Sequence, residues 1–255
     1  MLKDDNKKIV LITGSSSGLG ASLAKVLVKL DYTPIITYRH NEVKARELTS
    51  LLSKETESEI ICRHLDVSNE DGFTDVYSDI MRTYGRLDTL ICNAGSDFYH
   101  ASLQDIKLKE WQEVFGTKVF GTFNSVMAML PLLKASKNPN IIMISASLGT
   151  KPDPLDPVYS SACAALNNFA QSLVYSLSSE KIRTNVICPG PMDTGLSYWT
   201  DLKRSQPDIF ASFKSSNPMN MQTDANHIAE LISAIDTNVS LNGNILYATG
   251  GSHLR

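Results

Sequence analysis

Short β-branched runs alternate along this chain with longer segments in which apolar residues recur at helical spacing. The runs have the length of buried strands, and the longer segments have the length of amphipathic helices. Neighbouring parallel strands need long crossovers, so this alternation predicts a parallel sheet covered by helices on both faces. We expect strands at residues 8–13, 32–38, 59–65, 87–93, 140–145, 183–189 and 243–249, and helices near 18–30, 41–54, 69–84, 103–135, 157–180 and 223–236.

The length of the chain suits one large α/β domain. Its 255 residues, 42% hydrophobic and 20% charged, can bury one core without a second domain, so we expect a single domain over residues 1–255. The stretch 195–222 breaks the alternation and mixes aromatic with polar residues. We interpret it as a substrate lid or loop.

The charge balance and the cysteines narrow the classes of partner. A net charge of -3 and a pI near 6.0 argue against nucleic acid and membrane partners and favour small molecules. Cys62, Cys92, Cys163 and Cys188 lie far apart, which suggests neither a metal site nor a disulfide framework. The N-terminus lacks a signal-peptide core, and no apolar run approaches the ~20 residues of a membrane span. We therefore expect a cytoplasmic protein with reduced thiols.

The sequence "TGSSSGLG", residues 13–20, lies between the first expected strand and the first expected helix. Gly14 permits a tight turn, Gly18 lets the backbone approach a pyrophosphate, and Gly20 lets the helix pack closely on the sheet. The free amides at the helix start then face the anion. This placement predicts a dinucleotide site, to which Ser16, Ser17 and Leu19 also belong.

These features resemble a family, the short-chain dehydrogenases/reductases, whose glycine signature is TGxxxGxG. The resemblance implies a Rossmann-type doubly wound sheet of seven parallel strands in three α/β/α layers. Three further motifs resemble those of the family and imply cofactor contacts: Asp66 and Val67 beside adenine, Asn93, Ala94 and Gly95 after the fourth strand, and Pro189, Gly190 and Thr194 on the nicotinamide side.

The end of the second strand bears on the choice of cofactor. NAD-binding members usually have an acidic residue there, which bonds the adenosine ribose hydroxyls. This chain has Tyr38 followed by Arg39. Without a repelling carboxylate, a guanidinium can bind a 2′-phosphate, so we predict NADP(H). Arg39 as a solvated surface residue is the alternative.

The catalytic positions depart from the family pattern of Asn, Ser, Tyr and Lys. Tyr159 matches the proton-transferring tyrosine, but Cys163, one helical turn later, occupies the lysine position. Ala146 stands where the family serine holds the substrate oxygen, and Lys118 stands where asparagine anchors a water. In reduction the tyrosine only delivers a proton, and a neutral phenol is the correct form near pH 7. Reduction should therefore suffer less than oxidation.

Two of the departures can compensate one another. In the family the asparagine and lysine are neighbours across a water, so Lys118 could extend its ammonium toward the space that the small Cys163 leaves. We take Tyr159 and Lys118 as the candidate catalytic residues. The alternative is a lysine that points to solvent or to a subunit interface.

Other side chains are weaker candidates for the missing roles. Ser145 and Ser147 flank Ala146, but side chains alternate near a strand end, so both should point away from the face that Ala146 occupies. Cys163 is a poor candidate for a nucleophile because no histidine lies in recognisable register with it, and a buried thiol more often packs in the core than takes part in a reaction.

The surroundings of Tyr159 suggest a carbonyl substrate of moderate size that is partly apolar. By the family's geometry, residues 96–100 and 150–157 would surround it together with aromatics of the lid, unless those aromatics are local packing. The helix that begins at Tyr159 is rich in small residues, and the family commonly pairs it between subunits, so we expect a homodimer or homotetramer. The lid aromatics are Tyr198, Trp199, Phe210 and Phe213.

Three functions remain open from the sequence. The first is an NADP(H)-dependent carbonyl reductase with an unusual active site. The second is a non-enzymatic family member that binds the nucleotide or a partner subunit as a scaffold or sensor. The third is an enzyme of changed chemistry, such as an isomerase or dehydratase, that uses the same pocket.

Overall fold

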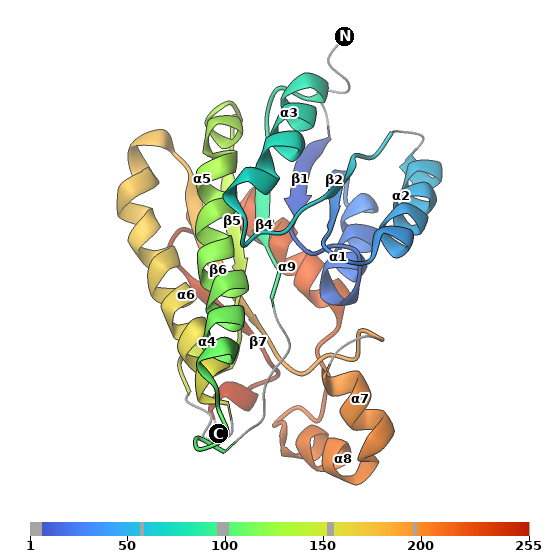
Figure 1. The fold of residues 1–255 in the computed structure, drawn as a ribbon, viewed down its shortest axis with the longest axis vertical. Coiled ribbons are helices and arrows are strands. Elements are labelled where there is room, and N and C mark those ends of the chain that lie inside the picture. The colour runs from blue at the N-terminus through green and yellow to red at the C-terminus, as the bar shows by residue number, and fades with distance from the viewer. Residues whose placement is uncertain (1–6, 57–58, 96–101, 152–155, 196–197, 255) are drawn as a thin grey trace.

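The computed structural model describes residues 7–56, 59–95, 102–151, 156–195 and 198–254. Within them, seven strands form one sheet in the order β3-β2-β1-β4-β5-β6-β7, and every neighbouring pair is parallel (Figure 1). The strands are β1 Lys8–Ile12, β2 Tyr32–Tyr38, β3 Cys62–His64, β4 Thr89–Cys92, β5 Asn140–Ile144, β6 Arg183–Pro189 and β7 Ile245–Ala248.

Helices cover both faces of the sheet, as the alternation predicts, and each face has its own apolar core. Helices α1, α2 and α9 pack on one face, and α3, α5 and α6 pack on the other. The helices are α1 Gly18–Val28, α2 Glu42–Thr56, α3 Phe73–Thr83, α4 Leu108–Phe115, α5 Gly121–Lys134, α6 Pro157–Leu177, α7 Tyr198–Ser205, α8 Pro207–Ser216 and α9 Ala225–Thr237, with 3₁₀ turns at Glu70–Gly72, Ser147–Gly149, Ser178–Glu180 and Ser252–Leu254. This three-layer Rossmann-type fold is the expected one. Across the described residues, every helix is too short or too polar to cross a lipid bilayer.

Each strand lies within its predicted run, but β3, β4 and β7 are shorter than predicted by three or four residues. Strands β2 and β6 have the predicted bounds. Strand β3 is shorter than the predicted run 59–65 because it lies at the edge of the sheet and pairs only with β2. Its Arg63 and His64 side chains are exposed, so solvent and not a second strand covers that edge.

The predicted helical stretch 103–135 is divided in the structure. Helix α4 is followed by a π-helical turn, Gly116–Phe120, and then by α5. Gly121 lets the start of α5 lie close to the segment after β3, because a Cβ there would lie 2.5 Å from Cγ2 of Val67. A π-helical turn changes the angular position of the side chains around the helix axis, and here it carries Lys118.

The stretch 195–222 is not an irregular loop where the structure describes it. It forms the two short helices α7 and α8, and Pro207 begins α8 at a position where proline is well tolerated. Figure 1 shows both helices beyond the end of the sheet toward which β1 points. That end is where the predicted cofactor residues lie.

Candidate active site

The predicted cofactor residues come together at one edge of the sheet. Gly14 follows β1, Arg39 follows β2, Asp66 follows β3, Asn93 follows β4 and Gly190 follows β6. Since the strands are parallel, these carboxyl ends all open on the same side, where doubly wound sheets bind their ligands. The structure therefore assembles in space the motifs that are far apart in the chain.

The glycine loop has the backbone geometry that its sequence predicts. Gly14 and Gly18 have φ values of +66° and +57°, a region that side chains disfavour. A Cβ on Gly20 would lie 2.6 Å from the Gly14 carbonyl oxygen and 2.7 Å from Nδ2 of Asn93. Glycine at position 20 thus lets α1 start in direct contact with the loop. Ser17 is the N-cap of α1 and makes no side-chain capping bond, which leaves the first amides of the helix available to an anion.

Thr13 is a residue that the sequence reasoning missed. Its Oγ1 accepts hydrogen bonds from the backbone amides of Asn93 and Ala94, both at 3.0 Å. Nδ2 of Asn93 donates in return to the Thr13 carbonyl oxygen at 3.0 Å. The Gly14 amide donates to Oγ1 of Thr37 at 3.1 Å, so β2 also holds the loop. The only sequence signal for this role is that Thr13 begins the glycine motif.

The adenosine end of the predicted site carries charge. The Asp66 carboxylate accepts hydrogen bonds from the Ser68 amide at 3.0 Å and the Ser68 hydroxyl at 2.7 Å. Burial alone would raise the pKa of Asp66, but the bonds from Ser68 outweigh it, and the charge of Arg39 acts in the same direction as those bonds, so the pKa is lowered. Arg39 and His40 are exposed on the loop after β2.

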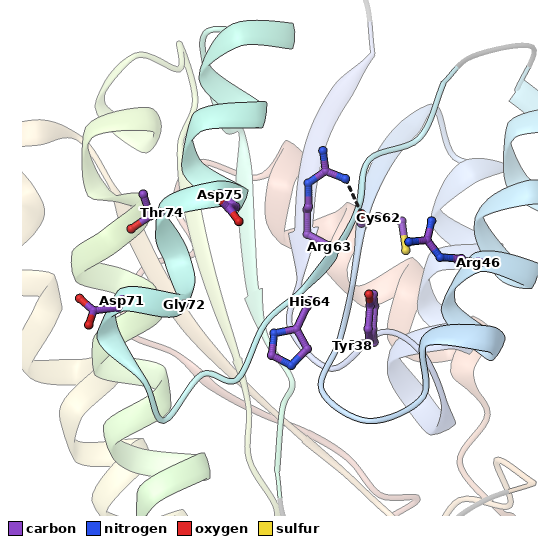
Figure 2. Close-up of a pocket in the computed structure, with 9 residues that line it drawn as sticks. All are labelled: Tyr38, Arg46, Cys62, Arg63, His64, Asp71, Gly72, Thr74 and Asp75. Atoms are coloured by element: carbon purple, nitrogen blue, oxygen red, sulfur yellow. Dashed lines mark hydrogen bonds between the residues drawn. The ribbon is translucent and has the colours of Figure 1, made fainter.

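A cavity of about 310 Å³ lies around the edge strand β3 and is distinct from the predicted catalytic position. Figure 2 shows its nine lining residues, which come from the end of β2, from α2, from β3, from the 3₁₀ turn Glu70–Gly72 and from the start of α3. Its arginines are already paired: Arg46 with Glu42 at 2.6 Å, and Arg63 with Asp79. None of the predicted cofactor or catalytic residues lines this cavity.

Tyr159 lies in the first turn of α6. Asp156 caps this helix, and its Oδ1 accepts a hydrogen bond from the Tyr159 amide at 3.2 Å. Tyr159 is only 8% exposed. Burial raises the pKa of the Tyr159 phenol well above its usual value, and neighbouring Cys163 acts in the same direction. The phenol is therefore a protonated donor across the neutral pH range.

The side chain of Lys118 points into the protein and not to solvent. Lys118 is 4% exposed, and its Nζ donates a hydrogen bond to the carbonyl oxygen of Ile144 at 3.2 Å. Nζ lies 4.9 Å from the centroid of the Tyr159 ring, and a Cβ on Gly95 would lie 4.0 Å from it. A positive charge is thus buried near both the Tyr159 ring and the predicted cofactor motif after β4.

Positions 163 and 146 hold neither the lysine nor the serine of the family pattern. Burial raises the pKa of the Cys163 thiol, although the charge of Lys118 opposes this, so the thiol is protonated at neutral pH. Ala146 packs against the cluster that contains Tyr159 and Cys163. Ser145 donates to the Cys163 carbonyl oxygen at 3.4 Å, so its hydroxyl faces the backbone of α6. Ser145 thus contacts the same residue, Cys163, whose cluster Ala146 packs against.

Some predicted residues have fewer connections or lie outside the described part of the chain. Within the described residues, no hydrogen bond joins Thr194 to another predicted site residue. Phe210 packs locally under Lys203, whose Nζ lies 5.9 Å from its ring centroid. Residues 96–100, residues 152–155 and the side chains of Tyr198 and Phe213 fall outside the described part.

Comparison with known proteins identifies the family. A model of the short chain dehydrogenases matches residues 8–203. The chain is 31% identical over 192 residues to a benzil reductase of Saccharomyces cerevisiae that forms (S)-benzoin, an alignment that covers 73% of this chain and 72% of the relative. It is 27% identical over 195 residues to glucose 1-dehydrogenase 2 of Bacillus subtilis, an alignment that covers 76% and 75% of the two chains.

A solved structure, ElxO with NADP bound, is similar over 98% of this chain and 100% of its own, with a TM-score of 0.88 and 26% identity. The likeness extends beyond residue 203 and includes the region of α7 and α8. The chain therefore belongs to the short-chain dehydrogenase family, a family of oxidoreductases built on a nicotinamide-binding Rossmann fold.

Proposed function

We propose that this protein is an NADP(H)-dependent carbonyl reductase in which Tyr159 donates the proton and Lys118 supplies the positive charge. The observation that carries the proposal is the buried ammonium of Lys118, 4.9 Å from the centroid of the Tyr159 ring. The family lysine is absent from position 163, and a cation from a different helix occupies the neighbourhood of the tyrosine.

The edge of the sheet fits a nicotinamide dinucleotide. A Cβ on Gly14 would lie 3.2 Å from Cα of Ala94, so the glycine loop and the segment after β4 form a cradle that side chains would fill. The cofactor, when bound, supplies the hydride. The residues that we propose to hold it are Gly14, Ser16, Ser17, Gly18, Leu19, Gly20, Arg39, Asp66, Val67, Asn93, Ala94, Gly95, Pro189, Gly190 and Thr194.

NADP(H) is favoured over NAD(H) by the end of β2. Tyr38 offers no carboxylate to repel a 2′-phosphate, and Arg39 is exposed on the loop that follows. The bonds from Ser68 hold the Asp66 carboxylate beside the end of β3. It therefore does not take the place of the ribose-binding acid that NAD-binding members have at the end of β2. The relative ElxO, solved with NADP bound, is in line with this choice.

The proton chemistry follows from the burial of Tyr159. Its raised pKa keeps the phenol protonated, so it can donate to the oxygen of a carbonyl as that oxygen gains negative charge. The proton leaves the phenol as its O–H bond breaks, and the phenolate that remains has the Lys118 ammonium 4.9 Å from its ring centroid. Lys118 therefore stabilises the phenolate, which is the charged product of the proton transfer.

The substrate oxygen lacks one hydrogen-bond donor of the family pattern, the serine hydroxyl. Ala146 provides a methyl group where the family serine would donate, and loss of such a donor typically lowers the rate by roughly 10²–10³-fold. We therefore propose a slower enzyme than a member with the complete set. The apolar side chains Trp111, Phe115 and Leu148 pack against the cluster around Tyr159 and favour a partly apolar carbonyl substrate. Helices α7 and α8, in the stretch 195–222, are our proposed lid.

The proposal is tested by NADPH consumption across a panel of aldehydes and ketones. Tyr159→Phe should abolish turnover of any active substrate, because the variant lacks the proton. Tyr175→Phe is the matched control, since Tyr175 lies on the same helix and is 88% exposed. Equal turnover by the wild type and Tyr159→Phe would refute the assignment.

A nucleotide-binding scaffold is the second candidate function, and one observation favours it. Positions 146 and 163 hold an alanine and a protonated buried thiol, and Lys118 replaces the asparagine, so three of the four family groups are missing. Calorimetry that detects NADPH binding, together with no turnover of any carbonyl, would favour the scaffold. Conversion of a substrate without net NADPH consumption would favour an isomerase or dehydratase in the same pocket.

We also propose a homodimer or homotetramer in the cytoplasm. Phe123 and Met127 on α5 are exposed, and a second copy of the chain would cover them. The four cysteines are free thiols, as expected in a reducing compartment. Light scattering of the wild type beside Met127→Glu tests the assembly, and a monomeric wild type would refute it.

A further inference from the structure

The loop between β2 and α2 contains a pair of neighbouring side chains that the family pattern does not include. Nε of Arg39 donates a hydrogen bond to Nε2 of His40 at 2.7 Å. A histidine nitrogen that accepts a hydrogen bond carries no proton, so the His40 ring is neutral in this arrangement and Nδ1 carries its hydrogen. The bond therefore joins a cation to an uncharged acceptor.

This bond uses one particular edge of the guanidinium. Arginine presents five N–H groups in a rigid, planar fork, and a phosphate is best bound by two of them at once. His40 occupies only the Nε–H of Arg39. The two terminal nitrogens remain as a pair, and the planarity of the group then fixes the direction in which that pair points.

Two carboxylates on the neighbouring segments, Asp66 and Glu42, have partners other than Arg39. The Asp66 carboxylate accepts two hydrogen bonds from Ser68, and the charge of Arg39 has a weaker influence on its pKa than those bonds. On the neighbouring helix, Glu42 is paired with Arg46 at 2.6 Å. Neither carboxylate forms an ion pair with Arg39, so His40 is its hydrogen-bonding partner in the structure.

We propose that His40 is a positioning residue for cofactor selectivity: it orients the Arg39 guanidinium so that its two terminal nitrogens bind the 2′-phosphate of NADP(H). This inference rests on the proposed NADP(H) preference and adds a second residue to it. His40 acts through Arg39 and not on the reacting atoms. It should therefore change the affinity for NADPH and leave that for NADH unchanged.

The experiment measures dissociation constants of NADPH and NADH by fluorescence titration. His40→Ala should weaken NADPH binding about three- to tenfold, the range expected for one net hydrogen bond, with no change for NADH. His40→Gln retains an acceptor at a similar distance along the side chain and should restore most of the preference. His227→Ala is the control, since this histidine is exposed on a different helix, α9.

A double-mutant cycle separates the two proposals. Arg39→Gln should remove most of the preference for NADPH, and His40→Ala should then have no further effect, because the group that it positions is gone. If Arg39→Gln leaves the ratio of the two constants unchanged, the NADP(H) preference itself is wrong. If Arg39→Gln lowers the ratio but His40→Ala does not, or acts equally in both backgrounds, the positioning role is wrong.

Discussion

Replacement of Lys118 by methionine removes the buried charge and retains most of the side-chain volume. The ammonium has one hydrogen bond in the structure, to the Ile144 carbonyl oxygen, and lies beside the Tyr159 ring. A buried cation of this kind is expensive to desolvate, so an apolar replacement should leave the stability equal or higher. The expected signature is therefore a loss of activity without a loss of stability.

The magnitude of the loss follows from the distance. With 4.9 Å between Nζ and the ring centroid and an effective dielectric constant of about 20, the attraction between ammonium and phenolate is about 3 kcal/mol. If the phenolate is fully formed in the transition state, loss of this attraction lowers kcat by roughly two orders of magnitude. A partly formed charge gives a proportionally smaller loss.

The assay is the steady-state rate of NADPH consumption with an active carbonyl substrate, measured beside the melting temperature of each variant. Lys109→Met is the control, because Lys109 lies on the adjoining helix α4 and its side chain is 81% exposed. Lys118→Met with the kcat of the wild type would refute the role of the relocated cation. A fall in kcat that appears equally in Lys109→Met would point to a general effect of charge.

Three further predictions concern the proton donor Tyr159, the glycine loop of the cofactor site and the buried carboxylate of Asp236. Because burial raises the pKa of Tyr159, the phenolate needed for alcohol oxidation is scarce at neutral pH. The oxidation rate should therefore rise about tenfold per pH unit. A plateau of the oxidation rate below about pH 9 would contradict this. Gly20→Ala brings a Cβ within 2.6 Å of a backbone oxygen of the glycine loop, so NADPH binding should be lost and the melting temperature lowered, as calorimetry and a thermal melt would reveal. The Asp236 carboxylate accepts hydrogen bonds from buried tyrosine, threonine and asparagine side chains. Asp236→Ala should therefore lower the free energy of unfolding by about 3 kcal/mol in a urea titration. The control Asp201→Ala, at an exposed position, should lower it by less than about 0.5 kcal/mol.

The pattern of strands and helices could be predicted because it depends on short-range periodicity. Strands β2 and β6 are rich in β-branched residues, and both have the bounds expected from the sequence. The ends of other elements depend on neighbours that are distant in sequence. Strand β3 is shortened because it has only one partner strand, and α5 begins at Gly121, where Val67 leaves no room for a Cβ.

The chemistry of the cofactor loop was also contained in the sequence, because a positive φ at Gly14 and a close approach at Gly20 need glycine whatever surrounds them. The direction of a long flexible side chain is different. Whether Lys118 faces solvent or Tyr159 depends on the turn that carries it and on the Ile144 carbonyl oxygen that accepts its hydrogen bond. Residue order by itself thus determined the layers, the glycine cradle and the family, since these follow from local backbone preferences. Only the tertiary structure decided where the buried positive charge lies, because that position is set by groups brought together from separate parts of the chain.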